Sequence, residues 1–144
     1  RQAPHVPTMH VMWLNQNRRI MATVEVTLDN FKDTVENNST VFIDFWAEWC
    51  GPCRMFGPVY EQVSEDNPDF VFAKVDTEAE QQLAAEFRIS SIPTLRAIRD
   101  GIVIYSQPGA LPKDNLEELV KAVRDVDMDE VRADIEKQQA EASQ

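Results

Sequence analysis

The feature that most constrains the fold of this chain is an apolar run, Val41–Ala47, that leads almost directly into two cysteines, Cys50 and Cys53. A short apolar run of this kind favours a buried β-strand. After the cysteines, apolar residues recur at the i, i+3, i+4, i+7 spacing of one helix face: these are Phe56, Val59, Tyr60 and Val63. The sequence therefore predicts that both cysteines lie where a strand passes into a helix.

A cysteine at the start of a helix is chemically activated. The first turn has unpaired backbone N–H groups and the positive end of the helix dipole, which favour a thiolate over a thiol. Only the thiolate attacks a disulfide, so lowering a thiol pKa from about 8.5 towards about 7 increases the reactive fraction at neutral pH. We expect Cys50 to be the exposed nucleophile. Cys53, three residues later, is expected to attack the mixed disulfide and release the product.

The segment from Trp46 to Cys53, Trp-Ala-Glu-Trp-Cys-Gly-Pro-Cys, resembles the active-site segment of the thioredoxin family. The similarity extends from about Thr23 to about Val126. It implies a thioredoxin fold, an α/β architecture with a mixed central β-sheet and helices on both faces. The order of expected strands and helices along the chain predicts the same layered arrangement.

The same resemblance implies an activity and its partners. The expected activity is reduction of disulfides in target proteins, by dithiol–disulfide exchange through Cys50 and Cys53. Electrons would come from NADPH through a flavin-dependent thioredoxin reductase, and the chain itself would bind no cofactor. Expected acceptors are disulfide-forming enzymes such as ribonucleotide reductase or peroxiredoxins.

Two charged residues interrupt apolar runs. Asp44 lies within the run Val41–Ala47, where a carboxylate is costly unless it is paired or protonated, so burial should raise its pKa. A surface-facing acid on an edge strand is the alternative. By resemblance, Asp44 is the buried acid behind Cys53 and takes the Cys53 proton, directly or through water. Lys74 is either a snorkelling surface lysine or, by resemblance, the neighbour of that acid.

The remaining expected site residues form a surface for the target protein. The match of Ile92-Pro93-Thr94 to the family implies a cis Ile92–Pro93 bond that offers the Ile92 backbone to an extended substrate by strand addition. Gly109 lies in a segment that resembles the family's groove-bordering glycine loop. The alternative for Pro93 is an ordinary proline at the start of a strand. The alternative for the Gly109 segment is an ordinary turn. The expected contact surface around Cys50 comprises Trp49, Gly51, Pro52, Ile92, Pro93 and Gly109.

Patterning and turn residues place the other elements. Strands are expected over Thr23–Leu28, Phe70–Asp76, Leu95–Arg99 and Ile102–Gln107, with Asp100-Gly101 as a hairpin turn. Helices are expected over Asp29–Asn37, from Pro52 to about Asp66, over Glu80–Phe87 and over Lys113–Val126. A further short helix, started by Asp127 with Glu130 in a capping box, should fray after Glu136 because the sequence becomes polar.

The chain is expected to divide into three parts: an N-terminal extension (1–20), a thioredoxin domain (21–126) and an acidic helical tail (127–144). Residues 1–20 have no periodic pattern, and their best apolar run, Val11–Leu14, is too short for a signal-peptide core. We expect a disordered extension upstream of a natural start at Met21, native or added by cloning. A transit peptide is the alternative, because the segment holds three arginines and no acidic residue.

Composition limits the classes of partner and the cellular compartments that are expected. The net charge is −11, and residues 21–126 hold nine basic and nineteen acidic residues, which argues against binding of nucleic acid or anionic membrane. No apolar run approaches the length of a membrane span. The only two cysteines form one C-x-x-C motif, which fits a reducing compartment, so a monomeric cytoplasmic protein is expected. Zinc is not expected, because the only histidines, His5 and His10, lie about 40 residues upstream.

Two other functions are compatible with parts of the pattern. An oxidase or isomerase of the same fold is disfavoured because Gly51-Pro52 lacks the histidine that such relatives usually carry between their cysteines. A binding or holdase module would make the cysteines incidental. The joint presence of Cys50, Cys53, Asp44 and Pro93 argues against that interpretation.

Overall fold

Five strands form a single sheet in the computed structural model, which describes residues 22–143. The predictions for residues 1–20 and for Met21 lie outside the described residues. The strands are β1 (Val24–Glu25), β2 (Thr40–Trp46), β3 (Val71–Asp76), β4 (Thr94–Arg99) and β5 (Ile102–Pro108). The helices are α2 (Leu28–Glu36), α3 (Gly51–Asp66), α4 (Gln81–Glu86), α5 (Lys113–Asp125) and α6 (Met128–Ala142).

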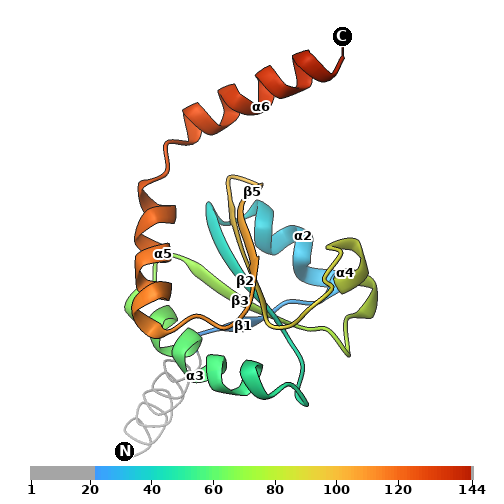
Figure 1. The fold of residues 1–144 in the computed structure, drawn as a ribbon, viewed down its shortest axis with the longest axis vertical. Helices are drawn as coiled ribbons and strands as arrows, with labels where there is room; N and C mark the ends of the chain where they lie inside the picture. Colours follow the sequence, from blue (N-terminus) through green and yellow to red (C-terminus); the bar gives the residue numbers. More distant parts are fainter. Residues whose placement is uncertain (1–21, 144) are drawn as a thin grey trace, which may run out of the picture.

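The sheet is mixed, with strand order β1-β3-β2-β4-β5. β3 is parallel to both β1 and β2, whereas β4 is antiparallel to β2 and β5 is antiparallel to β4. Helices α3 and α5 cover one face of the sheet, and α2 and α4 cover the other (Figure 1). The predicted α/β thioredoxin fold, with helices on both faces of a mixed sheet, is confirmed.

β2 is the central strand, and its side chains alternate between two cores. Phe42 packs against α3 and α5, whereas Ile43 and Phe45 pack on the side of α2 and α4. Alternation along a strand puts successive side chains on opposite faces, so Asp44 shares the face of Phe42, beneath α3. A strand that is paired on both edges and covered on both faces reads as a nearly continuous apolar run, which is the pattern of 41–47.

The first strand is shorter than predicted, because a helix cap interrupts it. Only Val24 and Glu25 pair with β3. The Thr27 hydroxyl accepts a hydrogen bond from the Asn30 N–H at 3.4 Å, and the Asn30 side chain accepts one from the Thr27 N–H at 2.8 Å. This reciprocal capping box starts α2 at Leu28. The strand predicted from the alternating pattern, Thr23–Leu28, is therefore longer than the observed one.

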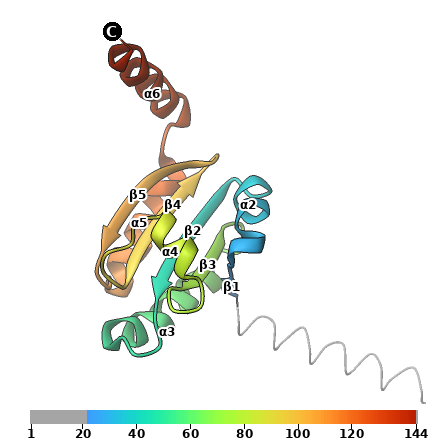
Figure 2. The same ribbon diagram turned by 90° about the vertical axis from the view of Figure 1, so that its right-hand side faces the viewer.

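The tail helix is longer than predicted. α6 begins after Asp127, whose carboxylate accepts hydrogen bonds from the N–H groups of Asp129 and Glu130, and it continues to Ala142. The expected fraying after Glu136 is wrong. Residues 136–142 are mainly glutamate, lysine, glutamine and alanine, which are strong helix formers, so their polarity marks an exposed helix. Both views show α6 extending away from the sheet (Figures 1 and 2).

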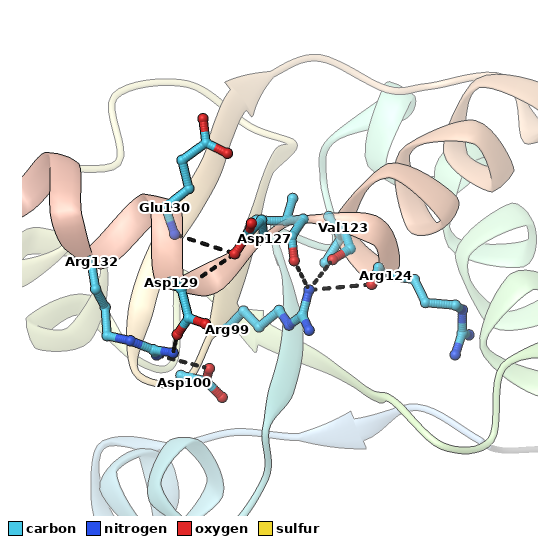
Figure 3. A network of polar contacts seen from close by, with 9 residues as sticks. Arg99, Asp100, Val123, Arg124, Asp127, Asp129, Glu130 and Arg132 are labelled. Atoms are coloured by element: carbon cyan, nitrogen blue, oxygen red, sulfur yellow. Dashed lines mark hydrogen bonds and ion pairs between the residues drawn. The ribbon is translucent and has the colours of Figure 1, made fainter.

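A single arginine fixes the turn between α5 and α6. The Arg99 guanidinium, at the end of β4, donates hydrogen bonds to the carbonyl oxygens of Val123, Arg124 and Val126 at 2.9, 3.2 and 2.8 Å (Figure 3). These carbonyls belong to the last turn of α5 and to its cap residue Val126, where most carbonyls lack helical partners. Arg132 of α6 adds ion pairs to Asp100 and Asp129. The tail therefore leaves the domain at the end of β4.

This arrangement predicts that Arg99 contributes more than Arg132 to the free energy of unfolding. Arg99→Leu should lower the free energy of unfolding by about 1–3 kcal/mol, because it leaves the partly buried Val126 carbonyl without its donor. Arg132→Leu removes only exposed ion pairs and should cost about 0–1 kcal/mol. Urea unfolding of both variants measures the difference. Equal losses would contradict the capping role of Arg99.

Candidate active site

The cysteines lie at the predicted junction of strand and helix. β2 ends at Trp46, a short turn follows, and Cys50 occupies the cap position of α3 with extended backbone angles (φ −86°, ψ 113°). Pro52 lies in the first helical turn, where a proline costs no hydrogen bond. Cys50 and Cys53 form a disulfide with a Cα–Cα distance of 5.3 Å. The extended cap residue brings Cys50 within bonding reach of the helical Cys53.

The helix start interacts directly with the Cys50 sulfur. The backbone N–H of Cys53 donates a hydrogen bond to the Cys50 Sγ at 3.2 Å. The same sulfur lies 3.7 Å from the carbonyl oxygen of Ile92. In the reduced state, an N–H donor and the positive end of the helix dipole favour negative charge on this sulfur. The Cys50 Sγ is therefore the position at which the fold stabilises a thiolate.

Exposure does not distinguish the two cysteines. Cys50 is 4% exposed and Cys53 is 3% exposed, and both pack with Ala47, Trp46 and Ile92. The expectation that Cys50 is the exposed thiol is therefore wrong for this disulfide form, because Ile92 and Trp46 cover the pair. The two sulfurs differ in position, because Cys50 is the cap residue of α3 and Cys53 lies within the helix, and not in accessible area.

Asp44 is fully buried, and neither carboxylate oxygen has a hydrogen-bond partner among residues 22–143. Burial raises its pKa from the ordinary value of 3.8 to about 7, and the charge of Lys74 opposes the rise. The alternative of an acid on an edge strand is wrong, since Asp44 is flanked by Lys74 of β3 and Leu95 of β4. A carboxyl group that changes protonation near neutral pH therefore lies under α3.

Lys74 lies beside Asp44 in the sheet and on the same face. Its ammonium lies 4.6 Å from the centroid of the Trp46 ring, and 4.0 Å from the position that a Cβ at Gly57 would take. The lysine is half-buried against the indole and α3. Within the described residues it makes no ion pair with Asp44, so its effect on the acid is a longer-range attraction.

Sequence reasoning missed that Tyr60 belongs to this buried polar group. Its hydroxyl donates a hydrogen bond to the carbonyl oxygen of Ala73 at 2.8 Å, next to Lys74 in β3. Burial, with the charge of Asp44 as the second cause, raises the Tyr60 pKa well above its usual value of 10.0. The spacing of α3 identified Tyr60 only as a core residue. A hydroxyl in an otherwise apolar stripe was the available signal.

The structure brings three of the expected contact residues together. The Ile92–Pro93 peptide bond is cis, as the resemblance implies. The N–H of Gly109 donates a hydrogen bond to the Pro93 carbonyl at 2.8 Å, so the glycine loop lies against this segment. Gly109 has φ of +106°, a region that residues with side chains rarely adopt. Cys50, Ile92, Pro93 and Gly109 therefore form one continuous site.

The other expected contact residues lie on the helix side of the disulfide. Gly51 and Pro52 are exposed in the first turn of α3, and Trp49 is 68% exposed. Trp49 also lines a cavity of about 730 Å³ whose other walls are charged. These walls are Glu48, Arg54, Asp76 and Glu78. Trp49 thus presents an indole ring beside the cysteines.

A cysteine pair at a helix cap, a buried acid beneath that helix and a cis-proline loop against the sulfur define a thiol–disulfide oxidoreductase. The family model described as Thioredoxin matches residues 22–122. The chain belongs to the thioredoxin family, and its Cys50–Cys53 pair is redox-active: the dithiol form reduces disulfides in target proteins and is converted to the disulfide seen here.

Individual relatives agree with this assignment. The chain is 56% identical over 121 residues to a putative thioredoxin 2 from Streptomyces coelicolor, covering 84% of this chain and 90% of that relative. It is 39% identical to a thioredoxin of Bacillus subtilis, over 69% of this chain and 96% of that protein. A mutant thioredoxin from Halobacterium salinarum has a similar structure, with a TM-score of 0.68 and 30% identity, covering 74% of this chain and 95% of that one.

Two further observations concern the described part of the chain. Of the helices between residues 22 and 143, none has the length and apolarity that crossing a bilayer requires. Over the same range, no three side chains of histidine, cysteine, aspartate or glutamate gather in a way that could hold a metal ion.

The raised pKa of Asp44 predicts a pH-dependent cost to stability. Between about pH 4 and about pH 7 the folded protein keeps the Asp44 proton while the unfolded chain loses it, so stability falls as the pH rises. At about pH 8, Asp44→Asn should be more stable than the unsubstituted protein by up to about 4 kcal/mol, and near pH 4 the difference should be small. Urea unfolding of the disulfide form measures both values.

Glu65→Gln is the matched control, because Glu65 is an exposed carboxylate on α3. Its effect on stability should be small and nearly independent of pH. A pH-independent effect of Asp44→Asn would show that the Asp44 carboxyl group titrates normally in the folded protein.

Proposed function

We propose that Cys50 and Cys53 share the reduction of a target disulfide in two steps. The Cys50 thiolate attacks one target sulfur, which forms a mixed disulfide and expels the other target sulfur as a thiolate. The Cys53 thiolate then attacks the Cys50 Sγ, which releases the second target thiolate and leaves the Cys50–Cys53 disulfide. The observation that carries these roles is the Cys53 N–H bond to the Cys50 Sγ at the helix cap.

Asp44 is the group that accepts the Cys53 proton in the second step, directly or through water. Three features support this role: the carboxyl group is fully buried beneath α3, it has no hydrogen-bond partner among residues 22–143, and its pKa is about 7. An acid–base group transfers protons best when its pKa lies near the working pH. Lys74 attracts the ionised form and so adjusts the pKa of Asp44.

The target protein docks as an extended segment across the cis-proline loop. The backbone of Ile92 faces the Cys50 sulfur, and the Gly109 loop lies directly beside Pro93. An added strand makes main-chain hydrogen bonds that do not depend on the sequence of the target. Trp49, Gly51 and Pro52 supply the contact surface on the opposite side of the sulfur.

The electrons come from NADPH through a flavin-dependent thioredoxin reductase, and the chain itself binds no cofactor. We place the protein in the cytoplasm as a monomer, since the only two cysteines form the redox pair and no structural disulfide is available for an oxidising compartment. The excess of acidic residues disfavours nucleic acid and anionic membrane as partners. The redox domain comprises residues 21–126, and residues 127–144 form a separate acidic tail.

Serine substitutions should separate the two cysteine roles. Cys53→Ser retains the attacking thiol and lacks the resolving one, so it should accumulate a covalent mixed disulfide with the target. Cys50→Ser should form no such adduct and should lose turnover of insulin disulfides altogether. Non-reducing gel electrophoresis and an insulin reduction assay with dithiothreitol as electron donor measure both results. Retained function in Cys50→Ser would instead support a binding module.

The direction of electron flow predicts the redox potential of the pair. Equilibration of Cys50–Cys53 against a glutathione or dithiol buffer at neutral pH should give a midpoint near about −270 mV, the value typical of an intracellular reductant. A value of about −180 mV or higher would mean that the pair donates its disulfide, and the protein would then be an oxidase or isomerase. The absence of a titratable couple would exclude both redox functions.

A further inference from the structure

Met55 has the most exposed large apolar side chain among residues 22–143, and the mechanism above gives it no role. Met55 is 78% exposed, more than Trp49 at 68%. It lies in the second turn of α3, five residues after Cys50. A helical side chain leans over the turn that precedes it, so the Met55 thioether lies towards Gly51 and Pro52. It therefore adjoins Gly51 and Pro52 of the proposed contact surface for the target protein.

A thioether at this position has two chemical properties that matter. It is soft and unbranched, so it adapts to partners of different shape, and methionine is used in this way at surfaces that bind many proteins. It is also open to oxidation, because its reactivity towards peroxides follows its exposure. The described residues contain one other methionine, Met128, which is only 6% exposed at the start of α6.

We propose that Met55 is a peroxide modification site that controls docking of target proteins. The thioether sulfur attacks one oxygen of a hydroperoxide, the O–O bond breaks, and the products are the Met55 sulfoxide and water or an alcohol. The sulfur is oxidised by two electrons and the peroxide is reduced by two. The sulfoxide is polar, so an apolar contact beside Cys50 is replaced by a group that needs hydrogen bonds when covered.

The disulfide form is the state in which this modification is selective. Cys50 and Cys53 are joined to each other, so neither sulfur is available as a thiolate for the peroxide. Both cysteines are also nearly covered, whereas Met55 is the exposed sulfur among residues 22–143. Sulfoxide formation leaves the Cys50–Cys53 couple chemically intact. The consequence is a change in affinity for the target, without loss of the chemistry.

This inference rests on the proposed docking surface, and one experiment tests both parts separately. The disulfide form of the full chain is treated with hydrogen peroxide, the peroxide is removed, and peptide mass spectrometry follows the gain of oxygen at Met55 and Met128. Insulin reduction is then measured against insulin concentration, with dithiothreitol as electron donor. We expect faster oxidation of Met55 than of Met128, and a KM increase of about five-fold with kcat nearly unchanged, which corresponds to about 1 kcal/mol.

Met55→Leu and Met128→Leu are treated in parallel, and each variant is compared with its own untreated form. Peroxide should leave the KM of Met55→Leu unchanged, while Met128→Leu should respond like the unsubstituted protein. An equal KM increase in Met55→Leu, slower oxidation of Met55 than of Met128, or an unchanged KM after complete Met55 oxidation would each overturn the inference. Failure of the untreated protein to reduce insulin would instead refute the proposed function, independently of what the mass spectra show.

Discussion

The burial of β2 on both faces and both edges is the constraint on which the redox site depends. It fixes Asp44 beneath α3 with no hydrogen-bond partner among the described residues. The same strand ends at Trp46, so the next few residues must turn and start α3 at Cys50. A carboxyl group and a disulfide are thereby held in one layer of the molecule. The position of the carboxyl group relative to the disulfide follows from the position of β2 in the sheet.

The surroundings of Cys50 and Asp44 have opposite effects on negative charge at these two groups. The helix cap favours negative charge on the Cys50 sulfur, through the Cys53 N–H. Burial disfavours negative charge on Asp44 and raises its pKa to about 7. The helix cap and the buried strand thus shift ionisation in opposite directions at two groups on the same side of the sheet. Stability is reduced by the buried acid above about pH 4, which is the kind of cost that a functional group imposes on a core.

The sequence predicted those parts of the molecule in which one physical effect dominates. The apolar run 41–47 predicted a buried strand, and the residues that follow it predicted a helix starting at the cysteines. The match of Ile92-Pro93-Thr94 to a family motif predicted the cis Ile92–Pro93 bond. Predictions failed where two local effects compete. At Thr27 a helix cap interrupts an alternating strand pattern, and after Glu136 helix propensity outweighs polarity.

Properties of the assembled surface could not be predicted in the same way. The covering of Cys50 depends on Ile92, which is distant in sequence, and on the path of the loop that carries it. The raised pKa of Tyr60 depends on burial and on its proximity to Asp44, and its hydroxyl donates a hydrogen bond to the carbonyl oxygen of Ala73 in another element. The position of Lys74 against the Trp46 ring depends on the register of β2 and β3. No local pattern encodes such contacts between separate elements.

β4 also separates the redox site from the tail. It begins at Thr94, directly after the cis-proline, and ends at Arg99, which holds the last turn of α5. Six extended residues place these two ends about 17 Å apart. Arg99 therefore holds the turn before α6 at the end of β4 opposite the cis-proline, and Arg132 adds an exposed ion pair to Asp100 there (Figure 3). An acidic helix in that place can be altered or bound by another molecule without covering the sulfur that performs the exchange.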